Sequence, residues 1–251
     1  MEVRIESRKN PLLQQVRKLL SSRGEREKTG LFVADGTKLL LEAIRYCPTL
    51  HTVILSDGVP APELPDHVRL VRVPRDVMAS VSPMEAPQGA VFLCGIPEEA
   101  PFLPAPGCLL LDGIQDPGNL GTILRTADAL NVPVALLEGC ADPYSWKVVR
   151  SSMGAVFRTK PVRTTWEQAK SACRDAGIPI GVTALSDRAL DLRRASLGAM
   201  AIVIGSEGQG VRGEILDCAD QELIIPMNPR CESLNAAIAA AIVMWQMKAE
   251  S

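Results

Sequence analysis

Short apolar runs alternate with amphipathic stretches over the second half of the chain. The apolar runs predict buried strands at Cys108–Leu111, Val134–Leu137, Ile178–Val182, Ala199–Ile204 and Glu222–Ile225. Helical spacing between them predicts helices at Leu120–Leu130, Trp166–Ala176, Val211–Ala219 and Leu234–Lys248. Strands that are apolar on both faces and alternate with helices indicate an α/β fold with a mostly parallel sheet. In such a fold, ligands bind at the carboxyl ends of the strands.

The first hundred residues show a smaller α/β pattern. Helical spacing at Leu12–Leu20 and Leu39–Ile44 predicts two helices, and short strands are predicted at His51–Leu55, Val68–Val73 and Ala90–Cys94. Residues 98–107 hold three prolines and one glycine, which indicates a linker without regular structure. We therefore expect a small α/β domain at 1–97, a Pro-rich linker at 98–107 and a second domain at 108–251.

Composition narrows the classes of protein that fit. With 251 residues, 47% of them hydrophobic and 22% charged, the chain has the composition of a soluble globular protein. The two histidines, His51 and His67, lie in the first third, which excludes a His-based zinc site or a Ser-His-Asp triad near the later motifs. Seven scattered cysteines and the absence of a signal-like or membrane-spanning apolar run predict a reduced, cytoplasmic protein.

The net charge of −2 conceals two basic stretches. Residues 1–31 contain eight lysines and arginines against four acidic residues. A second basic run spans Lys147–Arg163, with no acidic residue between Tyr144 and Trp166. Each stretch fits either an ordinary solvated face or a surface that faces phosphate groups.

The first of three strand-to-loop motifs is Leu111–Asp128. An apolar strand ends at Leu111, glycines and a proline shape a turn, and a helix follows. Asn119 and Arg125 lie near the start of that helix, where backbone N–H groups and the helix dipole favour a phosphate. The alternative is structural, with Asn119 as the helix cap and Arg125 paired to Asp128.

The second motif, Ile204–Val211, is a strand that enters a glycine-rich turn. Its glycines are spaced G-x-x-G-x-G, which differs from the dinucleotide fingerprint G-x-G-x-x-G and lacks the Gly-Lys-Ser/Thr of a P-loop. Such a turn lets backbone approach a ligand closely, but alone it also fits a simple turn.

The third motif is Leu223–Ala239, an apolar strand followed by a proline-punctuated loop and an alanine-rich helix. Ser233 stands where it can cap that helix. Glu232, Ser233 and Asn235 form a polar group at the start of an otherwise apolar helix, which capping alone does not explain.

In order, spacing and content, the three motifs together resemble those of the SpoU/TrmH branch of the SPOUT RNA methyltransferases. The first domain, with Ser7–Pro11 and Phe32–Gly36, is similar to the substrate-binding domain of many members, although Asp35 stands where the family has Glu. The resemblance implies a C-terminal α/β-knot domain with a trefoil knot, preceded by a small α/β RNA-binding domain. It also implies S-adenosylmethionine as cofactor and a homodimer through the C-terminal domain.

The implied reaction is methyl transfer to a ribose 2′-hydroxyl of RNA, without a metal. The resemblance implies catalytic roles for Arg125, Asn119, Glu207, Ser233 and Asn235. It implies that the cofactor is bound by Thr183, Ala184, Leu185, Gly205, Ile225, Met227 and Leu234. Because an arginine is a poor proton acceptor near neutral pH, we expect Arg125 to fix the target ribose and its phosphate while the other four organise the hydroxyl.

The separate first domain favours 23S-type ribosomal RNA as substrate by family analogy. The basic residues expected to contact RNA are Arg8, Lys9, Arg17, Lys18, Lys147 and Arg150. Three alternatives remain open: a tRNA 2′-O-methyltransferase, a non-enzymatic RNA-binding protein with a decayed site, and a nucleotide-dependent oxidoreductase using the glycine loop.

Overall fold

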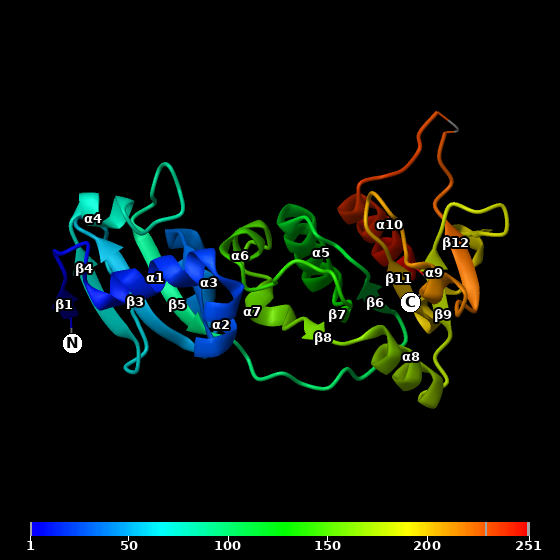
Figure 1. The fold of residues 1–251 in the computed structure, drawn as a ribbon, viewed down its shortest axis with the longest axis horizontal. Coiled ribbons are helices and arrows are strands. Elements are labelled where there is room, and N and C mark those ends of the chain that lie inside the picture. Colours follow the sequence, from blue (N-terminus) through cyan, green and yellow to red (C-terminus); the bar gives the residue numbers. More distant parts are fainter. Residues whose placement is uncertain (1, 229, 250–251) are drawn as a thin grey trace. The chain divides into compact units, whose positions relative to one another are not determined.

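The computed structural model describes residues 2–228 and 230–249, so Pro229 of the third motif lies outside the described residues. The chain forms two compact units (Figure 1). The first comprises the residues up to Glu98 together with Tyr144–Arg158. The second comprises Glu99–Pro143 and the chain from Thr159 onward.

The first unit is built on a five-stranded mixed sheet of order β1-β4-β3-β5-β2. Its strands are β1 (Glu2–Arg4), β2 (Leu31–Asp35), β3 (Leu50–Ser56), β4 (Arg69–Val73) and β5 (Ala90–Gly95). β3 pairs parallel with β4 and antiparallel with β5. Four helices accompany the sheet: α1 (Pro11–Ser21), α2 (Arg23–Thr29), α3 (Thr37–Tyr46) and α4 (Arg75–Ala79). The predicted helices and strands of this region are confirmed, whereas β1, β2, α2 and α4 were not predicted.

Helix α1 begins where its sequence provides a cap. The Asn10 side chain accepts a hydrogen bond from the Leu12 backbone N–H at 3.0 Å, and Pro11 fills the first helical position. Leu13, Val16 and Leu19 then recur on one face and are buried against one side of the sheet, in a cluster that includes Val33, Ile54 and Val71.

A segment from the middle of the chain completes the other side of that sheet. It carries α6 (Trp146–Ser151) and leads into α7 (Val156–Thr159). Tyr144, Val149 and Phe157 are buried in one cluster with Phe32 and residues of α3. The Phe32 ring centroid lies 5.1 Å from that of Tyr144 and 6.3 Å from that of Phe157. The chain therefore passes between the two units three times, once after Glu98 and at each end of Tyr144–Arg158.

The second unit contains a seven-stranded sheet of order β10-β12-β9-β11-β6-β7-β8 in which every pairing is parallel. The strands are β6 (Cys108–Leu111), β7 (Val134–Leu136), β8 (Val162–Arg163), β9 (Ile180–Thr183), β10 (Leu190–Asp191), β11 (Ala201–Ile204) and β12 (Gln221–Ile224). Its helices are α5 (Pro117–Leu130), α8 (Trp166–Asp175), α9 (Gly213–Leu216) and α10 (Ala236–Ala249), with 3-10 turns η1 (Leu192–Arg194) and η2 (Leu197–Ala199). The predicted α/β class and mostly parallel sheet are confirmed.

Helices cover both faces of this sheet. Trp166 of α8 and Ile215 of α9 are buried against Leu110, Ile180 and Val203 on one face. α5 and α10 contact each other, and α10 also contacts β11. Helix α9 is shorter than the predicted Val211–Ala219, because Val211 ends the preceding loop and is buried in the sheet cluster. Within the described residues no helix is long and apolar enough to cross a membrane.

Candidate active site

The three motifs leave the same edge of the sheet. They begin at the carboxyl ends of β6, β11 and β12, and β9 lies between β11 and β12. Because all these strands are parallel, their following loops gather at one edge, which is the usual ligand-binding edge of an α/β sheet. The loop after β9 starts at Ala184, whose backbone N–H donates to the Leu223 carbonyl at 2.9 Å.

One residue from each motif meets in a hydrogen-bonded cluster. Asn119 Nδ2 donates to Glu207 Oε1 at 2.7 Å, and Asn235 Nδ2 donates to the same oxygen at 2.5 Å. Asn235 Nδ2 also donates to Asn119 Oδ1 at 3.0 Å. The backbone N–H of Ala236, the first residue of α10, is a third donor to Glu207 Oε1 at 3.1 Å. The structure thus brings together three of the five predicted catalytic residues.

Asn119 is free to join this cluster because another residue caps its helix. The Asp116 side chain accepts from the Asn119 backbone N–H at 2.8 Å, and Pro117 occupies the first turn. The structural alternative of Asn119 as the cap of α5 is therefore wrong. Its side-chain amide instead points to Glu207 and Asn235.

Glu207 is carried by a tight loop. The backbones of Ser206 and Gly210 exchange two hydrogen bonds, at 3.1 and 2.9 Å, and Gly210 adopts a positive φ of 67°. A Cβ atom on Gly205 would lie 2.2 Å from the carbonyl carbon of Gly210, so only glycine allows the loop to close this tightly.

Asn235, and not Ser233, caps α10. Its Oδ1 accepts from the backbone N–H groups of Ala237 at 3.0 Å and Ile238 at 3.2 Å. The prediction that Ser233 caps the helix is wrong, because the helix begins at Ala236, two residues later than predicted. Ser233 is exposed and has no hydrogen-bond partner among the described residues.

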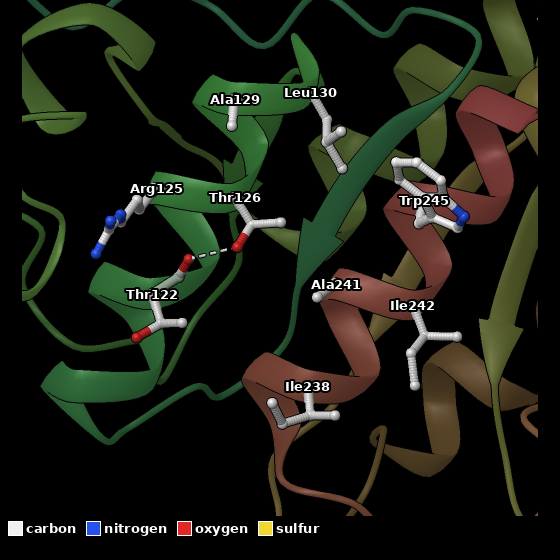
Figure 2. A pocket seen from close by; sticks show the side chains of 9 residues that line it. All are labelled: Thr122, Arg125, Thr126, Ala129, Leu130, Ile238, Ala241, Ile242 and Trp245. Carbon is white, nitrogen blue, oxygen red and sulfur yellow. Dashed lines mark hydrogen bonds between the residues drawn. The ribbon is translucent and has the colours of Figure 1, made fainter.

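Arg125 lies further along α5, outside the cluster. It is exposed, and among the described residues its guanidinium has no ion-pair partner, so the alternative of a pair with Asp128 is not realised. Arg125 lines an open groove of about 660 Å³ between α5 and α10 (Figure 2). The groove is also lined by Thr122, Thr126, Ala129, Leu130, Ile238, Ala241, Ile242 and Trp245.

The residues predicted to bind the cofactor all lie at or beyond the carboxyl ends of β9, β11 and β12, which are adjacent strands. Thr183 is the last residue of β9, and its hydroxyl donates to the Val203 carbonyl at 3.1 Å. Ala184 and Leu185 follow it, and Gly205 directly follows β11. Ile225 and Met227 follow β12, and Leu234 precedes Asn235. Within the described chain, the backbones of Met227 and Leu234 make no hydrogen bond, so their polar groups are available to a ligand.

Two charged residues that the sequence analysis did not single out lie beside the cluster. Asp112 is the residue directly after β6, and Arg212 directly precedes α9. Arg212 Nε donates to Asp112 Oδ1 at 2.7 Å, and its Nη2 donates to Glu138 Oε2 at 2.8 Å. Burial raises the pKa of Glu138, but hydrogen bonds from the backbone and Arg212 outweigh it and leave that pKa lowered. The sequence did offer one sign of Asp112: it is a carboxylate directly after β6, a strand of apolar residues only.

Cys140 also lies at this edge but is not a nucleophile. Its thiol donates to the Leu111 carbonyl at 3.1 Å. Burial raises its pKa to about 11, so the thiol stays protonated near neutral pH.

The predicted RNA-contacting residues all lie in the first unit. Arg17 has a structural task, since its guanidinium donates to the Ser80 carbonyl at 3.1 Å, the Ser80 hydroxyl at 3.0 Å and the Arg8 carbonyl at 2.9 Å. Arg8 pairs with Asp76 at 2.7 Å. Lys9 and Lys18 are exposed, as are Lys147 and Arg150 on α6.

A family model described as "SpoU rRNA Methylase family" matches residues 107–245, and one described as "MRM3-like substrate binding domain" matches residues 10–91. Among curated proteins, the chain is 32% identical over 246 residues to the 23S rRNA (guanosine(2553)-2′-O)-methyltransferase RlmP of Bacillus subtilis, covering 97% of this chain and 98% of that protein.

Solved structures give the same assignment. An AdoMet-bound rRNA methyltransferase from Sinorhizobium meliloti superposes with a TM-score of 0.86 at 27% identity, covering 99% of this chain and 98% of the other. The SpoU methyltransferase AviRb from Streptomyces viridochromogenes, in complex with AdoMet, gives 0.84 at 25% identity, covering 95% and 97%. The fold and site define an α/β methyltransferase with an added substrate-binding domain. The chain belongs to the SpoU rRNA methylase family.

Proposed function

We propose that this protein transfers the methyl group of S-adenosylmethionine to a ribose 2′-hydroxyl of 23S-type ribosomal RNA. The observation that carries the proposal is the Asn119–Glu207–Asn235 cluster, which joins all three motifs at the ligand-binding edge of the sheet. The relative from Bacillus subtilis, named as a 23S rRNA 2′-O-methyltransferase, is similar over nearly the whole chain and supports both the reaction and the substrate.

The loops of β9, β11 and β12 fit S-adenosylmethionine. Within the described chain the backbone groups of Met227 and Leu234 make no hydrogen bond and can bond to a purine, and the apolar side chains of Leu185, Ile225 and Met227 can pack against its ring. Thr183, Ala184 and Gly205 would complete the site. When bound, the cofactor supplies an electrophilic sulfonium methyl group, so the protein needs no metal. We also propose that the loop of the third motif forms the trefoil knot of this domain.

The side chains around this site orient the substrate and remove its proton. We assign Arg125 to the target ribose and its 3′ or 5′ phosphate, because its guanidinium has no ionic partner among the described residues and offers a planar fork to oxygen atoms. Glu207, the only carboxylate in the cluster, receives the hydroxyl proton, while Asn119 and Asn235 hold that carboxylate in place through their bonds to Oε1. We assign Ser233, which lies exposed on the third-motif loop, to organising the target hydroxyl.

A second copy of the chain covers the groove beside Arg125. Ile238, Ile242 and Trp245 recur along one face of α10 and expose 52%, 36% and 67% of their surface. Three large apolar residues on one helix face indicate a contact with another protein surface. A homodimer through α5 and α10 buries them and places Arg125 at the interface of two copies.

The first unit binds the RNA. It contains the region that matches a substrate-binding domain and the exposed Lys9, Lys18, Lys147 and Arg150. We propose that residues 1–97 recognise RNA, that 98–107 link the parts, and that 108–251 carry the methyltransferase, with Tyr144–Arg158 packed on the RNA-binding unit. We also propose a cytoplasmic location.

A labelled-methyl assay with ribosomal RNA tests the function. Wild-type protein is expected to transfer label to ribosomal RNA and not to transfer RNA, whereas Arg125→Lys is expected to lose turnover or RNA affinity. Transfer to tRNA alone would establish the tRNA alternative. Binding of RNA without any methyl transfer would establish a non-enzymatic RNA-binding protein. Calorimetric binding of NAD in place of S-adenosylmethionine would establish the oxidoreductase alternative.

A further inference from the structure

Asp112 holds both ends of the loop that carries Glu207. Its backbone N–H donates to the carbonyl of Ile204, the residue before the loop, at 2.9 Å. Its carboxylate accepts from the backbone N–H of Arg212, the residue after the loop, at 3.0 Å, and from Arg212 Nε at 2.7 Å. The residues on both sides of the loop Gly205–Val211 are therefore bonded to the same residue at the end of β6.

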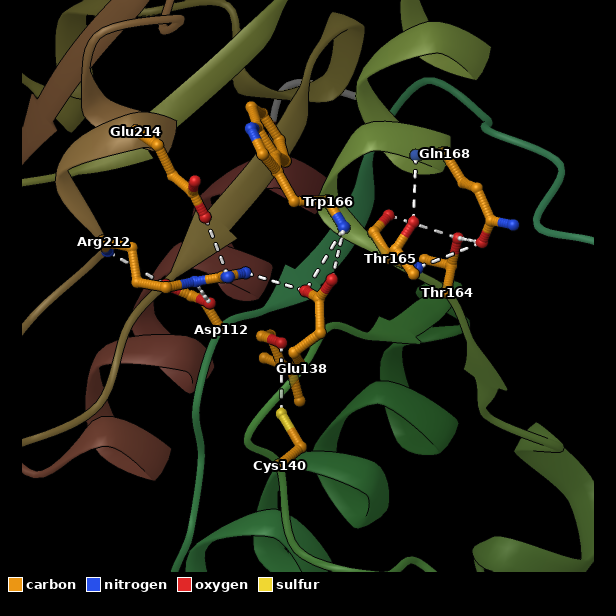
Figure 3. A network of polar contacts seen from close by, with 10 residues as sticks. Asp112, Glu138, Cys140, Thr164, Thr165, Trp166, Gln168, Arg212 and Glu214 are labelled. Atoms are coloured by element: carbon orange, nitrogen blue, oxygen red, sulfur yellow. Dashed lines mark hydrogen bonds and ion pairs between the residues drawn. The ribbon is translucent and has the colours of Figure 1, made fainter.

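Arg212 extends this attachment to three further elements (Figure 3). Its Nη2 donates to Glu138, which follows β7, at 2.8 Å, and its Nη1 donates to Glu214 in α9 at 2.9 Å. Both Glu138 carboxylate oxygens accept from the Trp166 backbone N–H at 3.2 Å, at the start of α8. One guanidinium thus links the ends of β6 and β7 to the starts of α8 and α9.

Asp112 is the buried carboxylate of this network. The Asp112 side chain is 2% exposed and that of Arg212 is 38% exposed, whereas Glu138 and Glu214 are 46% and 58% exposed. A buried carboxylate depends on its cation and N–H donors, while exposed ion pairs contribute little. Lysine at position 212 would keep the charge but could not hold three carboxylates with a planar fork.

We propose that Asp112 and Arg212 are positioning residues that fix the second-motif loop so that Glu207 meets Asn119 and Asn235. The inference rests on the proposed function of that cluster as the methyl-transfer site. Three N–H groups converge on Glu207 Oε1 within 2.5–3.1 Å, so a small displacement of the loop breaks these bonds. Among the described residues, Asp112 and Arg212 make no hydrogen bond with Asn119, Glu207 or Asn235, so they act through the loop.

The test compares Arg212→Lys with Arg193→Lys. Arg193 also pairs with an aspartate through two nitrogens. Its Nε donates to Asp191 at 2.9 Å, and within the described chain it makes no hydrogen bond to the loop Gly205–Val211. For Arg212→Lys, kcat for methyl transfer is expected to fall by roughly 10- to 100-fold, as for other small misplacements of catalytic groups, with an unchanged KM for RNA. Amide hydrogen exchange of Glu207–Gly210 should become faster. Arg193→Lys should change neither quantity.

Unchanged kcat per folded molecule together with unchanged exchange in the loop would overturn the proposal, even if the melting temperature fell. If Arg212→Lys does not fold, Asp112→Asn gives the same two measurements, because it keeps the backbone contact to Ile204 but removes the charge and one of the two oxygens that accept from Arg212. If the wild-type protein transfers no methyl group to RNA, the proposed function is refuted. The comparison of loop exchange between the wild type and Arg212→Lys still tests the positioning role in that case.

Discussion

Asn119 and Glu207 lie 88 positions apart in the chain, yet Asn119 Nδ2 donates to Glu207 Oε1 at 2.7 Å. The contact joins the start of α5 to the loop after β11, and Asn235 at the start of α10 bonds to both residues. Neutral amides around one carboxylate hold its free oxygen in a defined direction, as a proton-accepting group requires. This relationship makes the three motifs one site.

Glu207→Gln should lower kcat for methyl transfer by about 100-fold, because an amide is a weaker acceptor than a carboxylate and cannot take up a proton. The fold should be unchanged, since the replacement has the same shape. Gln209→Ala is the matched control, because Gln209 is exposed on the same loop and only its backbone N–H is bonded, to Ser206 Oγ at 3.3 Å. Full activity of Glu207→Gln would exclude a proton-accepting role.

Gly205→Ala should destabilise the second-motif loop. The new methyl carbon would lie 2.2 Å from the Gly210 carbonyl carbon and 2.3 Å from the Val211 nitrogen, so the backbone must move. We expect a loss of about 2–4 kcal/mol in the free energy of unfolding, measured by urea denaturation. Gly208→Ala has no atom within 4 Å of its new Cβ and should change stability by less than about 0.5 kcal/mol. Equal effects of the two substitutions would contradict the tight closure of this loop.

Trp245→Glu should convert the protein to a monomer. A charge at the exposed apolar face of α10 cannot be buried against a second copy without a large desolvation cost. Sedimentation equilibrium should give one chain for Trp245→Glu and two for the wild type. Lys248→Gln, on the same helix but outside the groove, should remain a dimer. A monomeric wild-type protein would leave the apolar face of α10 without the proposed partner.

Asp35→Asn should stabilise the first unit in a pH-dependent way. Burial raises the pKa of Asp35, although the hydrogen bond from Ser82 and the charge of Arg150 oppose the rise, and one carboxylate oxygen is buried without a partner. A raised carboxyl pKa means that the folded state binds the proton more tightly than the unfolded state. The stabilisation from this tighter proton binding is fully present below the pKa of Asp35 in the unfolded state, near 3.8. It is lost as the pH rises through the pKa of Asp35 in the folded state.

The substitution should therefore raise the melting temperature at pH 7 and have a much smaller effect near pH 3, measured by scanning calorimetry across that range. Ser82→Ala, which removes the hydroxyl donor at 2.7 Å, should lower stability at pH 7. A stabilisation by Asp35→Asn that is independent of pH would show that shape and not ionisation decides its effect.

Periodicity predicted the sheet of the second unit well because parallel strands buried on both faces are continuous apolar runs. Cys108–Leu111 is both the predicted and the observed β6. The start of α10 was misplaced, since Ser233 and Asn235 are both good caps and only the contact of Asn235 with Glu207 decides between them. Asn119, Glu207 and Asn235 were all among the predicted site residues, whereas the positioning pair was missed because Asp112 and Arg212 are 100 positions apart.

The packing of Tyr144–Arg158 in the first unit could not be predicted from the local sequence pattern either. Its apolar residues look like those of any helix in the second unit, and which core they join depends on surfaces such as the Phe32 ring. The same packing explains part of the basic central run. Arg158 pairs with Glu42 at 2.5 Å, which leaves Lys147 and Arg150 on α6 as the exposed cations of that segment.

Nucleoside mass spectrometry of ribosomal RNA methylated by the purified protein is the decisive measurement. RNA incubated with S-adenosylmethionine carrying a heavy methyl group would be digested to nucleosides and analysed for labelled ribose and labelled base. Wild-type protein should place the heavy methyl on a ribose of 23S-type RNA, and Glu207→Gln should leave that nucleoside nearly unlabelled. A heavy methyl on a base, or no labelled nucleoside, would contradict ribose 2′-O-methylation.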